Sequence, residues 1–254
     1  MSRQKRPGEV SLERALSKLG IASRTEARAW IESGKVRING IVQKNPLRWV
    51  VPEKARIEIN GEQVLRQKRI VLLLNKTRGT ITTRSDELGR STVFDLLPSS
   101  YRQLGGLHSV GRLDQATTGL LLLTNDSRLS SWLTDPKNRI PRVYRVSARG
   151  AIAPEQVESL LQGIPSEVGL LQAKSVETLK ISQRESHLLV TLHEGKNREI
   201  RRMIESIGSE VIDLRRISYG ALVLGKLPPG DCRSVSDSEL KKAFPEAPLN
   251  KGLE

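Results

Sequence analysis

The residues best suited to do chemistry lie in the stretch VGRLDQATTGLLLLTND, residues 110–126. Asp114 stands two residues after Arg112, in a glycine-bounded segment that leads into four consecutive leucines. A carboxylate at the entrance to a buried strand can act as a nucleophile, as a base or as a stabiliser of positive charge. It can also be an ordinary turn residue, because aspartate is common in turns. The stretch alone leaves both interpretations open.

A second charged group comes from the segment NREIRRMIESIG, residues 197–208. Its apolar residues recur at helical spacing and predict a helix that ends at Gly208; they are Ile200, Met203, Ile204 and Ile207. On this helical wheel Arg198 and Arg202 point away from the apolar stripe, whereas Arg201 lies on its flank. We therefore expect only Arg201 to reach a carboxylate at the sheet edge and to keep it ionised. The spacing fits a structural ion pair equally well.

The sequence lacks the signatures of several common enzyme classes. It contains no GxxxxGK[ST], no GxGxxG after a strand, no HExxH and no GxSxG. Nucleotide hydrolysis, dinucleotide chemistry, zinc hydrolysis and serine hydrolysis therefore lose their usual support. The three histidines, His108, His187 and His193, have no metal-ligand spacing with each other or with Cys232. We expect neither a metal site nor a cofactor.

The charge of the chain predicts an anionic partner. The 254 residues carry a formal net charge of +14, and the isoelectric point is near 10.3. Residues 1–66 contain 14 Lys and Arg against 7 Asp and Glu, so the N-terminal quarter holds half of the excess charge. No apolar run approaches the roughly 18 residues of a membrane-spanning helix, which favours nucleic acid over a membrane. A single cysteine and the absence of a signal peptide predict a cytoplasmic protein.

Residues 1–66 predict a small unit of two helices and a small antiparallel sheet. After a basic arm at 1–8, which we expect to be disordered, apolar spacing predicts a first helix that ends at Gly20. A capping box at Ser23 and Glu26 begins a second helix. Two Asn-Gly pairs, at 39–40 and 60–61, predict hairpins. The exposed helix positions offer four cations for RNA phosphates: Arg14, Lys18, Arg24 and Arg28.

The pattern of apolar residues changes after a charged linker at 61–69. Residues 69–79 and 118–126 contain continuous apolar runs, which are typical of strands buried on both faces. Residues 186–195 alternate instead, with Leu188, Val190 and Leu192 on one face. These patterns predict a second, mixed domain with a sizeable sheet.

Together these motifs resemble a known family, the pseudouridine synthases of the RsuA/RluB type. The resemblance rests on VGRLDQATTGLLLLTND, LLLNKTRG, RVYRV and HEGKNREIRRM, and it covers roughly residues 9–235. SRTEARAWIESGKVRING resembles the αL RNA-binding domain, similar to that of ribosomal protein S4, which many members carry. The resemblance implies an α+β fold with this domain at 9–66. It also implies a catalytic domain at 67–240 with a mixed, mainly antiparallel sheet and a central RNA cleft. From its final residues, APLNKGLE, we expect a loose tail at 241–254.

The resemblance also implies roles for particular residues. Asp114 matches the catalytic aspartate, and Tyr144 of RVYRV matches the tyrosine that packs on the target base and takes part in proton transfer. Arg201 matches the basic residue that pairs with the aspartate. Arg112 matches the arginine that helps to displace the target nucleotide from its stack.

Other positions in the matched motifs bear on RNA binding or depart from the family. Lys196 and Arg198, in EGKNREIRRM, are further candidates for RNA binding. Thr77 stands where the family often has proline, and Arg142 stands where it often has lysine. Both departures lie outside the catalytic set.

The implied activity is the isomerisation of uridine to pseudouridine in ribosomal RNA, by a monomer that needs no cofactor. EGKNREIRRM resembles the large-subunit (23S) branch, because the small-subunit (16S) branch tends to have a histidine-glutamine pair at 198–199. A 16S synthase and a noncatalytic RNA-binding factor in ribosome assembly remain the alternatives.

Overall fold

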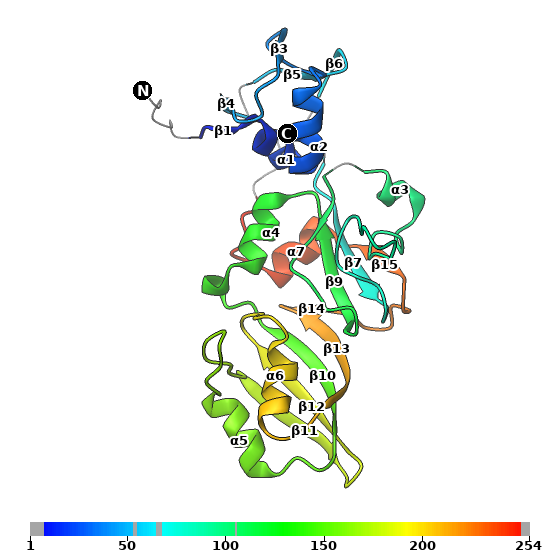
Figure 1. Cartoon of the computed structure of the whole chain (residues 1–254), viewed down its shortest axis with the longest axis vertical. Helices are drawn as coiled ribbons and strands as arrows, with labels where there is room; N and C mark the ends of the chain where they lie inside the picture. The colour runs from blue at the N-terminus through cyan, green and yellow to red at the C-terminus, as the bar shows by residue number, and fades with distance from the viewer. Residues whose placement is uncertain (1–7, 53–54, 65–67, 105, 250–254) are drawn as a thin grey trace.

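The computed structural model describes residues 8–52, 55–64, 68–104 and 106–249, which form a small N-terminal domain and a larger catalytic domain (Figure 1). The arm expected at 1–8 lies outside the described residues except for Gly8. The larger domain is itself elongated, with two groups of strands one below the other in this view.

Two helices organise the N-terminal domain, α1 (Leu12–Lys18) and α2 (Arg24–Glu32). The predicted capping box is confirmed, because the Glu26 amide donates to Ser23 Oγ at 3.2 Å and the Ser23 amide donates to Glu26 Oε2 at 2.8 Å. Apolar residues of both helices are buried against the small sheet beside them. The predicted two-helix unit is therefore present.

The N-terminal sheet has the strand order β3-β2-β5-β6. Both predicted hairpins are confirmed: Asn39 and Gly40 have φ of 50° and 81°, and Asn60 and Gly61 have φ of 53° and 88°. Asparagine and glycine tolerate these positive values, which tight hairpin turns require. The short strands are β1 (Val10–Ser11), β2 (Val36–Ile38), β3 (Ile41–Gln43), β4 (Trp49–Val50), β5 (Ile57–Ile59) and β6 (Glu62–Gln63). The linker predicted at 61–69 therefore begins too early, because the second turn leads into β6.

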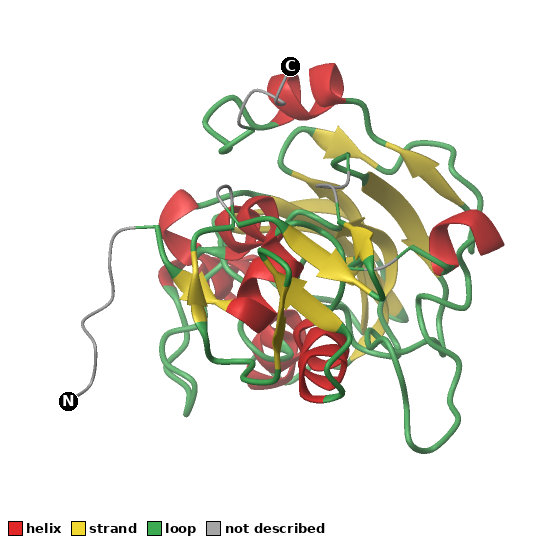
Figure 2. Cartoon of the chain, turned by 90° about the horizontal axis from the view of Figure 1, so that it is seen from above, coloured by secondary structure: helices red, strands yellow, loops and turns green. Residues whose placement is uncertain are grey.

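One sheet of nine strands forms the catalytic domain, and its main order is β11-β12-β10-β13-β9-β7-β15. Neighbouring strands are antiparallel except for β13 and β9, so the sheet is mixed and mainly antiparallel, as expected. Figure 2 shows it as a curved layer with helices on either side. Its strands are β7 (Val71–Lys76), β8 (His108–Ser109), β9 (Thr118–Thr124), β10 (Arg142–Arg149), β11 (Ser175–Ile181), β12 (Glu185–Leu192), β13 (Val211–Tyr219), β14 (Leu222–Val223) and β15 (Cys232–Ser234).

The middle of the sheet is buried on both faces, as the apolar runs predicted. Alternate residues of β7 and β9 enter two separate clusters, so that Leu72 and Leu121 face one core and Leu73 and Leu122 face the other. Two helices, α4 (Ser127–Thr134) and α7 (Asp237–Ala243), contribute to the second of these cores. Strand β9, which follows the Asp114 loop, is therefore packed against a hydrophobic core on each face.

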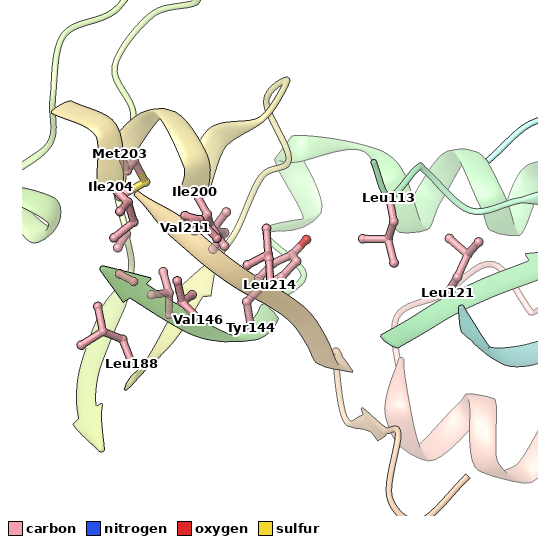
Figure 3. Close-up of a cluster of buried hydrophobic side chains, with 14 of the residues drawn as sticks. Leu113, Leu121, Tyr144, Val146, Leu188, Ile200, Met203, Ile204, Val211 and Leu214 are labelled. Atoms are coloured by element: carbon pink, nitrogen blue, oxygen red, sulfur yellow. The ribbon is translucent and has the colours of Figure 1, made fainter. Parts of the chain in front are cut away.

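The lower half of the catalytic domain contains β10 to β13 and the helix α6 (Glu199–Ser206). The predicted alternation along β12 is confirmed, with Leu188, Val190 and Leu192 buried. The apolar stripe of α6 packs on β10 and β13, as Figure 3 shows for Met203 and Ile204. The remaining helices are α3 (Ser99–Arg102), α5 (Pro154–Gln162) and the 3-10 turn η1 (Pro136–Asn138).

The structure corrects the expectation of a loose tail at 241–254. Helix α7 continues to Ala243, and Phe244 is buried, with its ring edge-on to Tyr219 and Trp132 at 6.4 Å between ring centroids. An aromatic side chain buries a large apolar area, so Phe244 packs the end of α7 against the core. Residues 250–254 lie outside the described residues.

The two domains are in direct contact. Gly20 lies beside Asn125, and Gly106 approaches Gly20 so closely that a Cβ there would lie 2.6 Å from its carbonyl oxygen. Arg84 of the catalytic domain lies 3.8 Å from Glu26 of α2. The basic N-terminal domain is thus placed against the end of the sheet that holds β7 and β9.

Candidate active site

Asp114 lies in the loop that joins β8 to β9. The Thr117 amide donates to the Asp114 carbonyl oxygen at 3.0 Å and closes a turn. On the other side of Asp114, the Leu113 carbonyl accepts a hydrogen bond from Thr82 Oγ1 at 2.7 Å. Because hydrogen bonds hold the backbone of both Leu113 and Asp114, the carboxylate projects from a loop with a defined shape.

A buried lysine, Lys76, donates hydrogen bonds to the backbone of the same loop. The ammonium of Lys76, at the end of β7, donates to the carbonyl oxygens of Thr117 at 2.8 Å, Thr77 at 3.1 Å and Gln115 at 3.3 Å. The side chain is fully buried, and this burial lowers the pKa of Lys76 to about 8 although the negative charge of Asp114 acts to raise it. A buried cation therefore lies within electrostatic reach of Asp114.

Tyr144 faces the same site from β10, in the other half of the sheet. It is almost completely buried, and Figure 3 shows its phenol oxygen on the side that faces Leu113. A small cavity of about 80 Å³ is lined by Asp114, Tyr144 and Leu214, among others. The structure thus brings together the carboxylate and the phenol that the sequence placed 30 positions apart.

Arg201 is buried on α6, as expected for a residue on the flank of the apolar stripe. Burial lowers the pKa of its guanidinium, the charge of Arg198 lowers it further, and the charge of Asp114 opposes both effects. Arg201 Nη1 donates to the Val211 carbonyl at 3.5 Å, and Nε has no hydrogen-bond partner in the part of the chain that the structure describes. Arg201 and Asp114 interact through their charges, but the ion pairs between described residues do not include a direct contact between them.

Arg198 corrects the helical-wheel prediction. Helix α6 begins at Glu199, and Arg198 adopts a left-handed conformation with φ of 52°. A helical wheel therefore does not describe the direction of the Arg198 side chain. This side chain lines two cavities together with Asp114. Arg112 lines the same two cavities, the larger of which has a volume of about 790 Å³ and extends along residues 81–90. Arg112 and Arg198 therefore flank the opening beside Asp114, whereas Arg201 lines neither of these two cavities.

Lys196 and Glu199 shape the wall of the small cavity. The Lys196 ammonium contacts Glu194 and donates to the Leu170 carbonyl at 2.6 Å, so its charge is partly neutralised within the protein. The Lys196 amide donates to Glu199 Oε2 at 3.0 Å. Burial raises the pKa of Glu199, whose Oε1 has no partner among the described residues.

The four predicted cations of the N-terminal domain differ in availability. Arg14 and Arg24 are exposed on α1 and α2. Arg28 is paired with Glu13, at 2.8 Å between Nη2 and Oε2. Lys18 is partly buried. Arg14 and Arg24 are therefore the best placed of the four to meet phosphates.

Comparison with known protein families identifies the chain. The model of the RNA pseudouridylate synthase family matches residues 70–206, and the S4 domain model matches residues 11–46. The chain belongs to the RNA pseudouridine synthase family. It is an isomerase of that family with an N-terminal S4 domain, and Asp114, Tyr144 and Arg201 all lie within the matched region.

Individual members of the family are similar over most of the chain. A ribosomal large subunit pseudouridine synthase B of Bacillus subtilis is 36% identical over 233 residues, which span 91% of this chain and 94% of that one. One of the same name from Pseudomonas aeruginosa is 35% identical and covers 92% of this chain, which spans 61% of that longer protein. A crystal structure of a pseudouridylate synthase superposes with a TM-score of 0.63 at 26% identity and covers 92% of this chain and 99% of that one.

Sequence reasoning missed three buried polar residues of this pseudouridine synthase. Lys76 ends a run of apolar residues in a strand buried along its whole length, and a lysine in that position was a signal of a special role. Glu199 and Arg216 carry no comparable signal, because each belongs to a charged stretch that is typical of an exposed surface. Their burial became visible only in the structure.

Two general features complete the description. Among the described residues, no cluster of three or more histidine, cysteine, aspartate or glutamate side chains could hold a metal ion. Within the same part of the chain, no helix has the length and apolar character needed to cross a membrane.

Proposed function

We propose that this chain converts a uridine of 23S ribosomal RNA to pseudouridine, with Asp114 as the catalytic carboxylate. The observation that carries the proposal is that Asp114 and Tyr144, from two halves of one sheet, line the same small cavity. The cations of Lys76 and Arg201 act on Asp114 from inside the protein. The two relatives named for the large ribosomal subunit support 23S over 16S.

The reaction needs no other reactant. The bond from the sugar carbon C1′ to the base nitrogen N1 breaks, the base turns, and C1′ forms a bond with carbon C5. The proton on C5 is lost and N1 gains a proton, so nothing is oxidised or reduced. We therefore propose that the chain acts without a cofactor.

In this proposal, the residues around the cavity have separate tasks. Asp114 acts at the sugar as nucleophile, base or electrostatic stabiliser. Tyr144 packs on the base and handles a proton, while Arg201 and Lys76 place two positive charges within electrostatic reach of the carboxylate. Arg112, at the mouth of the cavities, helps to displace the uridine from its stack, a step that costs a few kcal/mol.

RNA binding is assigned to the cations outside this centre. The proposed domain limits are 9–66 and 67–240. In the N-terminal domain, phosphates are contacted by Arg14, Lys18, Arg24 and Arg28. Arg198 and Lys196 add contacts beside the cavity. We also propose that the protein acts as a monomer in the cytoplasm, where ribosomal RNA is processed.

Pseudouridine mapping in ribosomal RNA tests the proposal. RNA from cells that lack the gene should miss one or more sites in 23S RNA, and the wild-type gene should restore them whereas the Asp114→Asn gene should not. A site missing from 16S RNA alone would replace 23S as the target. If no site is missing and Asp114→Asn corrects any defect in ribosome assembly, the protein is a binding factor and the proposal is wrong.

A further inference from the structure

Arg216 lies where the two halves of the catalytic sheet meet. On β13 it pairs with Gly119 of β9, in the one parallel contact of the described sheet. Gly119 has φ of 97°, and a Cβ there would lie 2.2 Å from the Arg216 carbonyl oxygen. The backbones therefore meet at a point that only glycine allows.

The side chain of Arg216 contacts both halves. Its Nε donates to the Leu120 carbonyl on β9 at 2.7 Å, and Nη1 donates to the Tyr144 hydroxyl oxygen on β10 at 3.5 Å. The guanidinium also lies 5.1 Å from the ring centre of Tyr219. Leu120 belongs to the strand that Asp114 precedes, so this one side chain links the Asp114 side of the site to Tyr144.

Arg216 is an unusual buried charge. It is 2% exposed, and Nη2 has no hydrogen-bond partner in the described part of the chain. None of the ion pairs between described residues involves it. A buried cation without a carboxylate lowers the stability of a fold. A stabilising ion pair therefore does not explain its presence here.

We propose that Arg216 is a positioning residue that fixes the hydroxyl of Tyr144 relative to Asp114. The inference rests on the proposed function and adds to it a residue outside the three catalytic positions. The guanidinium has donors in a planar fork, so Nε can stay on the Leu120 carbonyl while Nη1 reaches Tyr144. A lysine ammonium donates from a single nitrogen, so it cannot reproduce the separation between Nε and Nη1 that serves these two partners.

The direction of the contact matters for the chemistry. Since the guanidinium only donates, it contacts a lone pair of the phenol oxygen and leaves the phenol hydrogen for another acceptor. At 3.5 Å the hydrogen bond is long, so the cation orients the phenol mainly by attraction to its oxygen. The Tyr144 hydroxyl can then present its hydrogen to the bound nucleotide.

The first test compares Arg216→Lys with Arg215→Lys, the neighbouring arginine on the opposite face of β13. Single-turnover isomerisation should slow about tenfold or more in Arg216→Lys, with RNA affinity within about twofold of wild type. Arg215→Lys should behave as wild type. An unchanged rate in Arg216→Lys overturns the inference, whereas a wild-type protein that does not isomerise RNA contradicts the proposed function instead.

A double-mutant cycle shows whether Arg216 acts through the hydroxyl. In a Tyr144→Phe background the hydroxyl is absent, so Arg216→Lys should cause no further loss of rate. The same fractional loss in both backgrounds overturns the inference. Arg216→Gln, which can still donate to the Leu120 carbonyl, repeats the cycle if the lysine variant does not fold.

A fluorine NMR experiment tests the contact without any activity. The chain has only three tyrosines, Tyr101, Tyr144 and Tyr219, so fluorotyrosine labelling gives three signals that single Tyr→Phe variants assign. Arg216→Lys should shift the Tyr144 signal and leave that of Tyr101 in place. An unmoved Tyr144 signal in a folded variant means that Arg216 does not position the ring.

Discussion

The ammonium of Lys76 donates a hydrogen bond of 2.8 Å to the carbonyl oxygen of Thr117, three residues after Asp114. This contact joins the end of β7 to the loop that leads into β9, the strand with which β7 pairs. It places a fully buried cation beneath the candidate catalytic carboxylate. Lys76 therefore contributes both to the shape of the loop and to the positive charge around Asp114.

Replacing Lys76 by methionine should separate activity from stability. The carbonyls of Thr77 and Gln115 keep donors from Thr80 and Gly79, so the main loss is the donor to the Thr117 carbonyl, about 1–3 kcal/mol, and relief from burying a charge offsets a similar amount. We expect the free energy of unfolding in urea to change by less than about 1 kcal/mol, while the single-turnover rate falls about tenfold or more because the loop loosens. A rate equal to that of wild type would show that the loop holds its shape without Lys76.

The pKa of Lys76 also predicts a pH dependence of stability. It is about 8 in the folded protein, below the usual value of 10.5, so the unfolded chain binds more protons between these two values. The contribution of Lys76 to stability is fully present above pH 10.5 and is lost as the pH falls through about 8. The difference in unfolding free energy between wild type and Lys76→Met should therefore change across this window. Parallel profiles would contradict the lowered pKa.

Asp114→Asn should abolish isomerisation and leave RNA binding intact. The amide is nearly isosteric with the carboxylate but uncharged, so we expect at least about a hundredfold loss in rate. Affinity should stay near that of wild type, because it rests on many phosphate contacts. Tritium release from RNA labelled at carbon five of uracil measures turnover, with Asp237→Asn on α7 as the matched control. Retained turnover would remove Asp114 from the mechanism.

Tyr144→Phe keeps the ring and removes only the hydroxyl. If the hydroxyl handles a proton, the single-turnover rate should fall about a hundredfold with little change in RNA affinity. Tyr101→Phe is the control, because the hydroxyl of Tyr101 contacts Ser234 and its side chain does not line the cavity of Asp114. Near-normal chemistry in Tyr144→Phe would limit Tyr144 to packing.

The salt dependence of binding tests the N-terminal surface in the full chain. Arg14 and Arg24 are exposed, and each phosphate contact removed should reduce the slope of log affinity against log salt by about 0.7–0.9. The double variant Arg14→Gln, Arg24→Gln should therefore show a shallower slope than wild type. Arg149→Gln, whose arginine pairs with Glu210 at the far half of the sheet, should not. Equal slopes for wild type and the double variant would mean that this face has another partner.

Features governed by short-range chemistry could be predicted from the order of the residues. The Asn-Gly turns, the capping box at Ser23 and Glu26, and the apolar stripe of α6 follow from preferences within a few residues. For the same reason, the buried strands on either side of Asp114 were visible as continuous apolar runs. The motifs around Asp114 and Arg201 also indicated the family, because they are stretches of contiguous sequence.

Which charges are buried, and what they touch, depends on the packing of distant segments. Arg216 and Leu120 are 96 positions apart, and only the parallel contact between β13 and β9 brings them together. Lys76 reaches Thr117 across 41 positions for a similar reason, because its strand pairs with β9. Arg198 does not occupy its predicted helical face because α6 begins at Glu199, two residues after the start of the predicted helical segment at 197. A charged residue in a charged stretch is predicted to be exposed, because local sequence does not show which strands will pair around it. Burial is a property of the packed sheet and not of the local sequence.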